Sequence, residues 1–417
     1  MMHRHRGIIL ALGLFGLTAG CFSNEKLNSP SAPTGGTLFS RMVFMGNSIT
    51  AGFQSAGIND STQRQSYAFL VAQAAGAPYY YASLQGRGCP APFDDNSTQH
   101  RVGGGGPTDC DLRSPTPVPW LSNVAVPGAR TVETFDNFAT PVSASNALTT
   151  FILGGRTQVQ AMRAANPTLV SVWIGANDVL ASLTNSGNPG TPLAVTPSAT
   201  FNAQYDTLAA ELDSTGAKVV LIGVPDVTNI PYASFGATYW CLKNAPACGP
   251  QFGASSPFPA TFAVALSCAP SAAVPSEAGD SVLVPWTVGV PLIGAAALGA
   301  SDTLDCSVDA AVVTPSEFAN LKAAVAADNA KISAVAAAHG WAYFDPNPTL
   351  LALQADPTKV APFPSLPNTT GNPGPNVLFG SMFTLDGVHP SAAAHKIIAD
   401  SLIATINANF GTTVPLP

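Results

Sequence analysis

The stretch Met42-Val43-Phe44-Met45-Gly46-Asn47-Ser48 combines a short apolar run with a glycine and a serine. Four apolar residues in succession are typical of a strand that is buried on both faces of a sheet. Gly46 ends this strand, and a helix is expected to follow. A serine at such a junction lies at the carboxyl end of a parallel sheet, where open α/β folds bind their ligands. Ser48 is therefore the first candidate functional residue.

Apolar runs and helical patterns alternate along the rest of the chain. The runs predict strands at residues 42–45, 123–126, 169–174, 218–222 and 341–344, and the helical patterns predict helices at residues 67–75, 157–165, 201–212 and 391–409. The capping box Thr314-Pro315-Ser316-Glu317 opens one more helix, which should run to His339 and stop at Gly340. This alternation predicts an α/β fold with a central, mostly parallel sheet and crossover helices.

Two long stretches do not follow this alternation. Residues 77–121 are rich in Gly, Pro and Asp, and residues 232–313 are rich in Pro, Ala and Ser. Long loops in a compact domain are usually functional or cross-linked. We interpret both stretches as insertions over one end of the sheet, in which disulfides replace regular secondary structure.

The chain has seven cysteines, and six of them lie in the two insertions. Proximity in sequence favours the disulfides Cys89–Cys110, Cys241–Cys248 and Cys268–Cys306 among the pairings that six cysteines allow. Disulfides persist in oxidising compartments, so they indicate an exported protein. A zinc site is the alternative, but the chain has no CxxC motif and no His-rich spacing.

The overall composition narrows the class of protein. The 46% of hydrophobic residues suffices for a packed core, whereas the 10% of charged residues is well below the usual value of about 25%. The net charge is −7, without clusters of Lys or Arg. Because binding to nucleic acid depends on the release of counterions by clustered basic residues, no nucleic-acid partner is expected.

The N-terminus resembles the signal of a bacterial lipoprotein. Arg4 and Arg6 precede a short apolar run at residues 7–17, and small residues lead to Cys21. In such a signal the Cys is lipidated and becomes the new N-terminus, although Thr18 stands where Leu is usual. We expect a signal peptide at residues 1–20, a tether at 21–37 and one domain at 38–417. The protein would lie in the cell envelope, on the outer membrane, through its lipid; an ordinary secretory signal is the alternative.

Three further segments contain residues suited to catalysis at the ends of predicted strands. Gly128 allows a close approach of the backbone, and the Asn177 side chain can donate hydrogen bonds to an oxyanion. Asp386 stands three residues before His389, a spacing that lets the carboxylate hold the imidazole in one tautomer while its other nitrogen faces a serine.

With these four segments the chain resembles the GDSL/SGNH hydrolase superfamily, in which Ser, Gly, Asn and Asp-x-x-His blocks follow in this order. The resemblance implies a three-layer α/β/α sandwich of the flavodoxin-like type. It assigns Ser48 as nucleophile, His389 as general base and acid, Asp386 as its orienting residue, and Ser48, Gly128 and Asn177 as the oxyanion hole. Asn47 replaces the Asp of the family's name, which is not the acid of the triad.

We therefore expect a lipid-anchored serine esterase or lipase that needs no cofactor and acts on a small-molecule or lipid ester through an acyl-enzyme. The aliphatic residues at 282–291 favour an acyl or aryl ester over a sugar. The alternatives are a polysaccharide O-acetylesterase of the same superfamily and a surface lipoprotein that binds without turnover. The oligomeric state does not follow from the sequence.

Other polar residues near these segments are expected to have lesser roles. Asp178 is interpreted as a structural acid, and Asp226 as part of the cleft wall. His395 is expected to be exposed or to make a local hydrogen bond. His100, near Asp94-Asp95-Asn96, is a weak candidate for binding calcium or substrate.

Overall fold

The central sheet has four parallel strands in the order β1 (Met42–Gly46), β4 (Leu169–Trp173), β5 (Lys218–Ile222) and β10 (Ala342–Phe344). The predicted parallel sheet is thus confirmed. The remaining predicted strand, residues 123–126, runs along the free edge of β1 and gives hydrogen bonds from Val124 and Val126 to β1 carbonyl oxygens. It pairs regularly only at Asn123, so it forms a bridge and not a strand.

This computed structural model describes residues 36–95, 99–111, 113, 118–136, 147–245, 247–365 and 378–417, all within a unit that spans residues 33–417. The predicted signal peptide, Cys21 and most of the predicted tether lie outside the described residues. Among the residues it does describe, no helix is long and apolar enough to cross a membrane.

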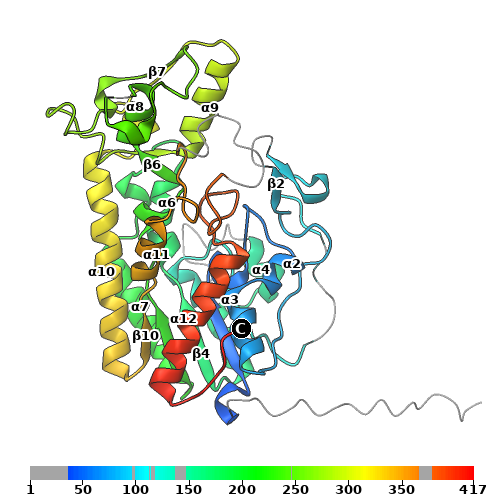
Figure 1. The fold of residues 1–417 in the computed structure, drawn as a ribbon. Coiled ribbons are helices and arrows are strands. Elements are labelled where there is room, and N and C mark those ends of the chain that lie inside the picture. Colours follow the sequence, from blue (N-terminus) through cyan, green and yellow to red (C-terminus); the bar gives the residue numbers. More distant parts are fainter. Residues whose placement is uncertain are drawn as a thin grey trace, which may run out of the picture. The chain divides into compact units, whose positions relative to one another are not determined.

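Helices cover both faces of the sheet (Figure 1). Along β1, Met42 and Phe44 point into the core beneath α3 (Tyr67–Ala74) and α12 (Ala392–Phe410), whereas Val43 and Met45 belong to the core on the opposite face. That second core packs beneath α5 (Gln158–Ala165), α7 (Ser198–Asp213) and α10 (Pro315–His339). The alternation of side chains along a strand therefore explains why every residue of β1 is buried.

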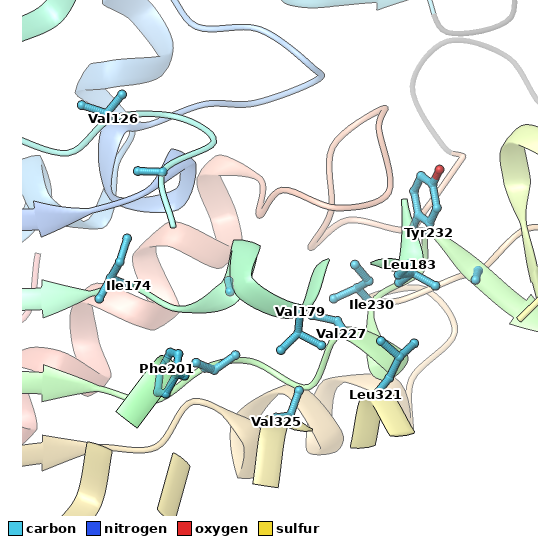
Figure 2. Packing of buried hydrophobic residues seen from close by; sticks show 14 of the residues in the cluster. Val126, Ile174, Val179, Leu183, Phe201, Val227, Ile230, Tyr232, Leu321 and Val325 are labelled. Carbon is cyan, nitrogen blue, oxygen red and sulfur yellow. The ribbon is translucent and has the colours of Figure 1, made fainter. Parts of the chain in front are cut away.

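The larger core continues beyond the sheet to the carboxyl ends of the strands. Figure 2 shows Val179, from α6 (Ala176–Leu183), near Leu321 and Val325 of α10, with Val227 and Ile230 beside them. The predicted capping box starts α10, since the Thr314 and Glu317 side chains each bond the other's backbone N–H. Packing of this kind fixes the strand ends from which the candidate residues extend.

The two insertions contain the three predicted disulfides but differ in structure. The first holds the hairpin β2 (Phe93–Asp95) and β3 (His100–Arg101) and the disulfide Cys89–Cys110. The second holds Cys241–Cys248 and Cys268–Cys306, together with β6 (Ala233–Phe235), α8 (Gly236–Lys243), β7 (Phe262–Val264), β8 (Leu283–Pro285), α9 (Trp286–Ala297) and β9 (Asp302–Leu304).

In Figure 1 the elements α8, β7 and α9 gather at the top of the view. The expectation that this second stretch lacks secondary structure was wrong, because strands of three residues are too short to show a periodic pattern. The remaining α-helices of the described residues are α1 (Ser48–Ala51), α2 (Asp60–Arg64), α4 (Ala147–Leu153) and α11 (Asn347–Gln354), and short 3-10 helices occur between these elements.

Gly46 supplies a test of how tightly β1 and β4 approach at the site. A Cβ atom at this position would lie 2.4 Å from Thr50 Oγ1 and 2.5 Å from the backbone oxygen of Trp173. Gly46→Ala should therefore lower the free energy of unfolding by about 3 kcal/mol, as overpacking against main chain does. Urea unfolding measures this loss.

The control is Gly340→Ala, at the C-cap of α10, where φ is +65° and a Cβ would meet nothing within 4 Å. Only the left-handed backbone opposes that change, at about 1 kcal/mol. Equal losses in the two variants would contradict the close approach at Gly46.

Candidate active site

Ser48 is the first residue of α1, and only Asn47 separates it from β1. The Asn47 side chain caps this helix by accepting a hydrogen bond from the Ile49 N–H at 3.2 Å. An Asp at the same position would make the same cap, so the difference from the family's Gly-Asp-Ser leaves the geometry intact. Ser48 is only 7% exposed, and its hydroxyl opens into a pocket at the carboxyl end of the sheet.

The Gly46 peptide that precedes Ser48 is held from both sides by one buried side chain. Gln158, at the start of α5, accepts a hydrogen bond from the Gly46 N–H at 2.9 Å and donates one to its carbonyl oxygen at 2.8 Å. The Val126 N–H also donates to this oxygen at 3.1 Å, so the bridge segment and β1 are joined at the same place. This role of Gln158 could not be predicted from the sequence, since a single Gln in a helical pattern carries no signal.

Hydrogen bonds join Ser48, His389 and Asp386 in a row. His389 Nε2 lies 2.9 Å from Ser48 Oγ, and His389 Nδ1 lies 2.8 Å from Asp386 Oδ2. Because a carboxylate only accepts, Nδ1 carries the proton and Nε2 presents its lone pair to the serine hydroxyl. This is the arrangement in which an imidazole can withdraw a proton from a serine.

The Asp386 carboxylate is buried and accepts five hydrogen bonds. Its donors are the His389 ring, the Thr384 hydroxyl, and the backbone N–H groups of Ala56, Val388 and His389. Burial raises the pKa of Asp386, but the charge of His389 and these bonds outweigh burial and lower the pKa to about 2. The carboxylate is therefore ionised at neutral pH, as an acid that orients a histidine must be.

One of these donors comes from a strained turn near Ser48. Ser55 and Ala56 have φ of +51° and +54°, a left-handed conformation that is unfavourable for residues other than glycine. The turn directs the Ala56 N–H to Asp386 at 2.6 Å, and the Ser55 N–H donates to the Thr384 hydroxyl at 2.9 Å. Arg101 of the first insertion binds the Ala56 carbonyl oxygen at 2.7 Å and thereby holds the turn in place.

The second insertion contacts the loop that carries Asp386 and His389. The Trp286 indole N–H donates to the Asp386 carbonyl oxygen at 3.1 Å, and its ring packs against Phe379. Gly387 has φ of +70°, and a Cβ there would come within 3.1 Å of Phe379 and Tyr232. Both insertions therefore help to position the acid, which makes them part of the site and not only a cover over the sheet.

Asn177, on α6, lies beside Ser48 and His389 in one pocket, which we call the serine pocket; its volume is about 330 Å³ with its open side included. Its amide donates one hydrogen bond to the Ala129 carbonyl oxygen at 2.9 Å, and an amide nitrogen has a second hydrogen to offer. Gly128, with φ of +81°, is exposed and stands in the turn that precedes Ala129. The structure thus brings Ser48, Asn177 and His389 to one pocket and places Gly128 next to the partner of Asn177.

Asp178 fixes this turn against α6. Its carboxylate accepts hydrogen bonds from the backbone N–H and the hydroxyl of Thr131, both at 2.9 Å, and from the Thr196 hydroxyl at 2.8 Å. All of these partners are structural, as expected for this residue. Asp226 likewise turns inward on its own segment, where it accepts from Thr228 and Asn229.

The structure buries one of the two remaining candidate histidines and exposes the other. His395 is fully buried, so the first alternative, an exposed side chain, was wrong. Its Nδ1 does accept a hydrogen bond, from the Tyr67 N–H at 3.2 Å, but this donor lies far away in the sequence. His100 is exposed and contacts Asp94 at 2.5 Å, while Asn96 lies outside the described residues. In the part of the chain that the structure describes, no group of three or more His, Cys, Asp or Glu side chains is placed to hold a metal ion.

A sheet with a hydrogen-bonded Ser, His and Asp at the carboxyl ends of its strands is the arrangement of a hydrolase. Residues 42–254, half of the chain, match the model of the GDSL-like lipase/acylhydrolase family, and the protein belongs to this family of ester-bond hydrolases. The match includes Ser48, Gly128 and Asn177 and ends before Asp386 and His389. The last two residues therefore rest on their Asp-x-x-His spacing and on the geometry, and not on this match.

Solved structures also resemble the fold. An acetyl xylan esterase, AlAXEase, is 13% identical (TM-score 0.33, 88% of this chain and 98% of that one), and an extracellular lipase from Streptomyces rimosus is 14% identical (TM-score 0.35, 88% and 98%). LAE5, an α/β hydrolase from the metagenome of Lake Arreo, Spain, is 12% identical (TM-score 0.37, 89% and 96%). TM-scores this low carry no argument about substrate. A comparison with curated protein sequences gives no match.

His395 predicts a dependence of stability on pH. Burial, with the charge of His389, lowers its pKa to about 3, below the value of 6.5 for a free histidine. Between these values the unfolded chain binds a proton that the folded chain does not, so stability falls as the pH decreases from 6.5, by up to about 1.4 kcal/mol per pH unit. Replacing His395 by Gln should remove this contribution, as urea unfolding between pH 6.5 and 4 would measure.

Tyr67→Phe is the matched control, because it removes the hydroxyl beside Thr50 but keeps His395 and its backbone donor. It should lower stability by a similar amount at every pH and keep the wild-type slope. An unchanged slope in His395→Gln would contradict a neutral, buried His395.

Proposed function

We propose that the protein is a serine esterase in which Ser48 is the nucleophile, His389 the general base and acid, and Asp386 the residue that orients His389. One observation carries this proposal. His389 has its Nδ1 bonded to an ionised, buried carboxylate and its Nε2 at 2.9 Å from Ser48 Oγ. A hydroxyl and an imidazole at this distance are in reach for proton transfer.

The reaction then proceeds in two steps. His389 Nε2 takes the proton of Ser48 as Oγ bonds to the carbonyl carbon of the ester, and the protonated imidazole gives this proton to the departing alcohol. A water molecule next loses its proton to Nε2 and attacks the acyl-enzyme. The acid is released as the proton returns to Ser48 Oγ. Asp386 stabilises the imidazolium in both steps, which its low pKa permits.

The negative charge on the carbonyl oxygen needs hydrogen-bond donors in the serine pocket. We assign them to the backbone N–H groups of Ser48 and Gly128 and to the Asn177 amide. The bond from Asn177 to Ala129 supports this assignment, because it orients the amide while leaving one hydrogen free to donate. One such donor is typically worth about 3 to 4 kcal/mol in the transition state.

An apolar ester is the substrate class that the serine pocket favours. Apart from Ser48, Asn47, Asn177 and His389, its lining is apolar and includes Leu180, Val227 and Ile230. The apolar residues at 282–291, on which the sequence-based preference for an acyl or aryl ester rested, do not line this pocket. A polysaccharide O-acetylesterase is the second candidate, and a lipoprotein that binds without turnover is the third.

Replacement of Ser48 by Ala tests the nucleophile. Hydrolysis of p-nitrophenyl butyrate should fall at least about a thousandfold, and labelling by a fluorophosphonate probe should disappear, because the probe reacts only with an activated serine. The circular-dichroism melt should stay near that of the wild type. Ser316→Ala, at an exposed helix start, is the matched control and should retain both activities.

Wild-type protein that hydrolyses the ester without reacting with the probe, or a Ser48→Ala variant that still turns over, would contradict this assignment. A correctly oxidised wild type that neither reacts nor hydrolyses any ester would favour the third candidate.

We also propose that the protein is exported and anchored to the outer membrane by a lipid on Cys21. The three disulfides support export, since such bonds persist in oxidising compartments. The basic and apolar segments before Cys21 support lipidation.

Replacement of Cys21 by Ser tests the anchor. Two acyl chains bind a membrane stably, so the wild type produced in a bacterial host should sediment with the membranes, and the variant should be soluble with its esterase activity retained. Immunoblots of the two fractions measure this. Wild-type protein in the soluble fraction would contradict the anchor and leave an ordinary secretory signal.

A further inference from the structure

An apolar groove opens next to the serine pocket, between α11, α12 and the carboxyl ends of two strands. Its volume is about 640 Å³ with its open side included. Side chains from three parts of the fold line it: Trp173 and Phe344 at the strand ends, Leu350 and Leu353 on α11, and Ile397 and Ile398 on α12. We call this space the apolar groove.

The apolar groove and the serine pocket share part of their lining. Ile49, Pro225, Ile230 and Val388 belong to both. Two of these residues are chain neighbours of the reacting groups, since Ile49 follows Ser48 and Val388 precedes His389. The two spaces are therefore adjacent, with these four side chains at their common boundary.

The chemistry of the lining selects the occupant. No charged side chain lines the apolar groove, and the polar groups of its lining side chains are the hydroxyls of Thr349 and Ser401, the indole N–H of Trp173 and the weakly accepting Met382 sulfur. A sugar has many hydroxyl groups that would lose their hydrogen bonds to water in such a space. A hydrocarbon chain makes no hydrogen bonds to water, and its transfer from water into an apolar space is favourable.

Helix α11 forms the outer wall and is fastened at both ends by side-chain amides. Asn347 donates to the Val224 carbonyl oxygen at 3.0 Å and accepts from the Asp226 N–H at 2.6 Å, and Gln354 donates to the Asn229 carbonyl oxygen. No residue of α11 is fully buried. Leu350 and Leu353 therefore remain partly exposed along the groove, as expected of side chains whose apolar partner is a ligand.

We propose that the apolar groove binds the acyl chain of the substrate, and hence that the natural substrate is an ester of a medium- or long-chain fatty acid. This inference rests on the proposed function. The acyl part stays bonded to Ser48 until water releases it, whereas the alcohol leaves after the first step. A groove adjacent to the serine pocket is therefore suited to the acyl part of the ester, which stays bonded to Ser48 after the alcohol has left.

The dependence of kcat/KM on acyl length tests the proposal. Each buried methylene contributes about a factor of four, so in a half-open groove p-nitrophenyl octanoate should exceed p-nitrophenyl acetate by at least about 30-fold in kcat/KM. Leu350→Trp fills the groove and should lower the octanoate-to-acetate ratio at least about tenfold. Leu350→Ser, which removes apolar contact without adding bulk, should lower the ratio in the same direction.

The next residue supplies the matched control. Leu351 lies on the same helix, is 62% exposed and does not line the groove, so Leu351→Trp should keep the wild-type ratio. Circular-dichroism melts of all variants identify any loss of folding. Octyl acetate and ethyl octanoate, compared in the wild type and in Leu350→Trp, separate a chain on the alcohol side from one on the acyl side.

Each outcome decides between the proposals. Three results would overturn the acyl groove: a kcat/KM that does not depend on acyl length, an unchanged octanoate-to-acetate ratio in both Leu350 variants, or deacetylation of acetylated xylan that is faster than hydrolysis of p-nitrophenyl octanoate. If the fluorophosphonate probe still labels Ser48 in these cases, the esterase proposal stands. If Leu350→Trp selectively loses hydrolysis of octyl acetate, the groove binds the alcohol part of the ester, and the acyl assignment is overturned. Loss of labelling together with hydrolysis would refute the esterase itself and, with it, the groove's role.

Discussion

The hydrogen bond between His389 Nε2 and Ser48 Oγ joins residues 341 positions apart in the chain, and the site exists only where both ends are held. Ser48 is fixed by the sheet, because the Gln158 side chain binds both the N–H and the carbonyl oxygen of Gly46, the strand residue two positions before Ser48. The loop that carries His389 is held by the turn at Ser55 and Ala56, which Arg101 of the first insertion binds in turn. Trp286 of the second insertion also bonds this loop, so the positions of both insertions affect the geometry of the site.

Burial of a carboxylate explains why this loop needs so many contacts. A buried, ionised acid is unfavourable unless hydrogen bonds and a cation compensate for the lost water. Five hydrogen bonds, two of them from His389, and the charge that His389 gains on protonation do so for Asp386, and its pKa falls in spite of burial. One donor, the Ala56 N–H, is available only because the backbone accepts an unfavourable left-handed turn, which Arg101 stabilises from the first insertion. The strain in this turn is thus offset at the site that it serves.

The sequence predicted the features that depend on local pattern. Short apolar runs located the strands of the sheet, and the ends of these runs pointed to Ser48, Asn177 and the segment at Gly128. Gln158, Arg101 and Trp286 could not be found in this way, because each acts through a contact with a distant segment and none stands in a recognisable motif. The segment at 123–126, at the edge of the sheet, was predicted as a full strand for a related reason, since an apolar run does not show how many of its residues pair with the neighbouring strand.

The position of the apolar groove separates substrate choice from chemistry. The family match ends at residue 254, whereas α11 and α12, which supply much of the groove lining, lie after residue 346. Ser48 and Asn177 are held by the sheet and its core, so side chains on α11 can vary without disturbing them. Asn347 and Gln354 fasten α11 to backbone around Val224, Asp226 and Asn229, the connection whose Pro225 and Ile230 line both spaces. A change in the length or anchoring of α11 would therefore alter the acyl chain that fits while the serine, histidine and aspartate keep their distances.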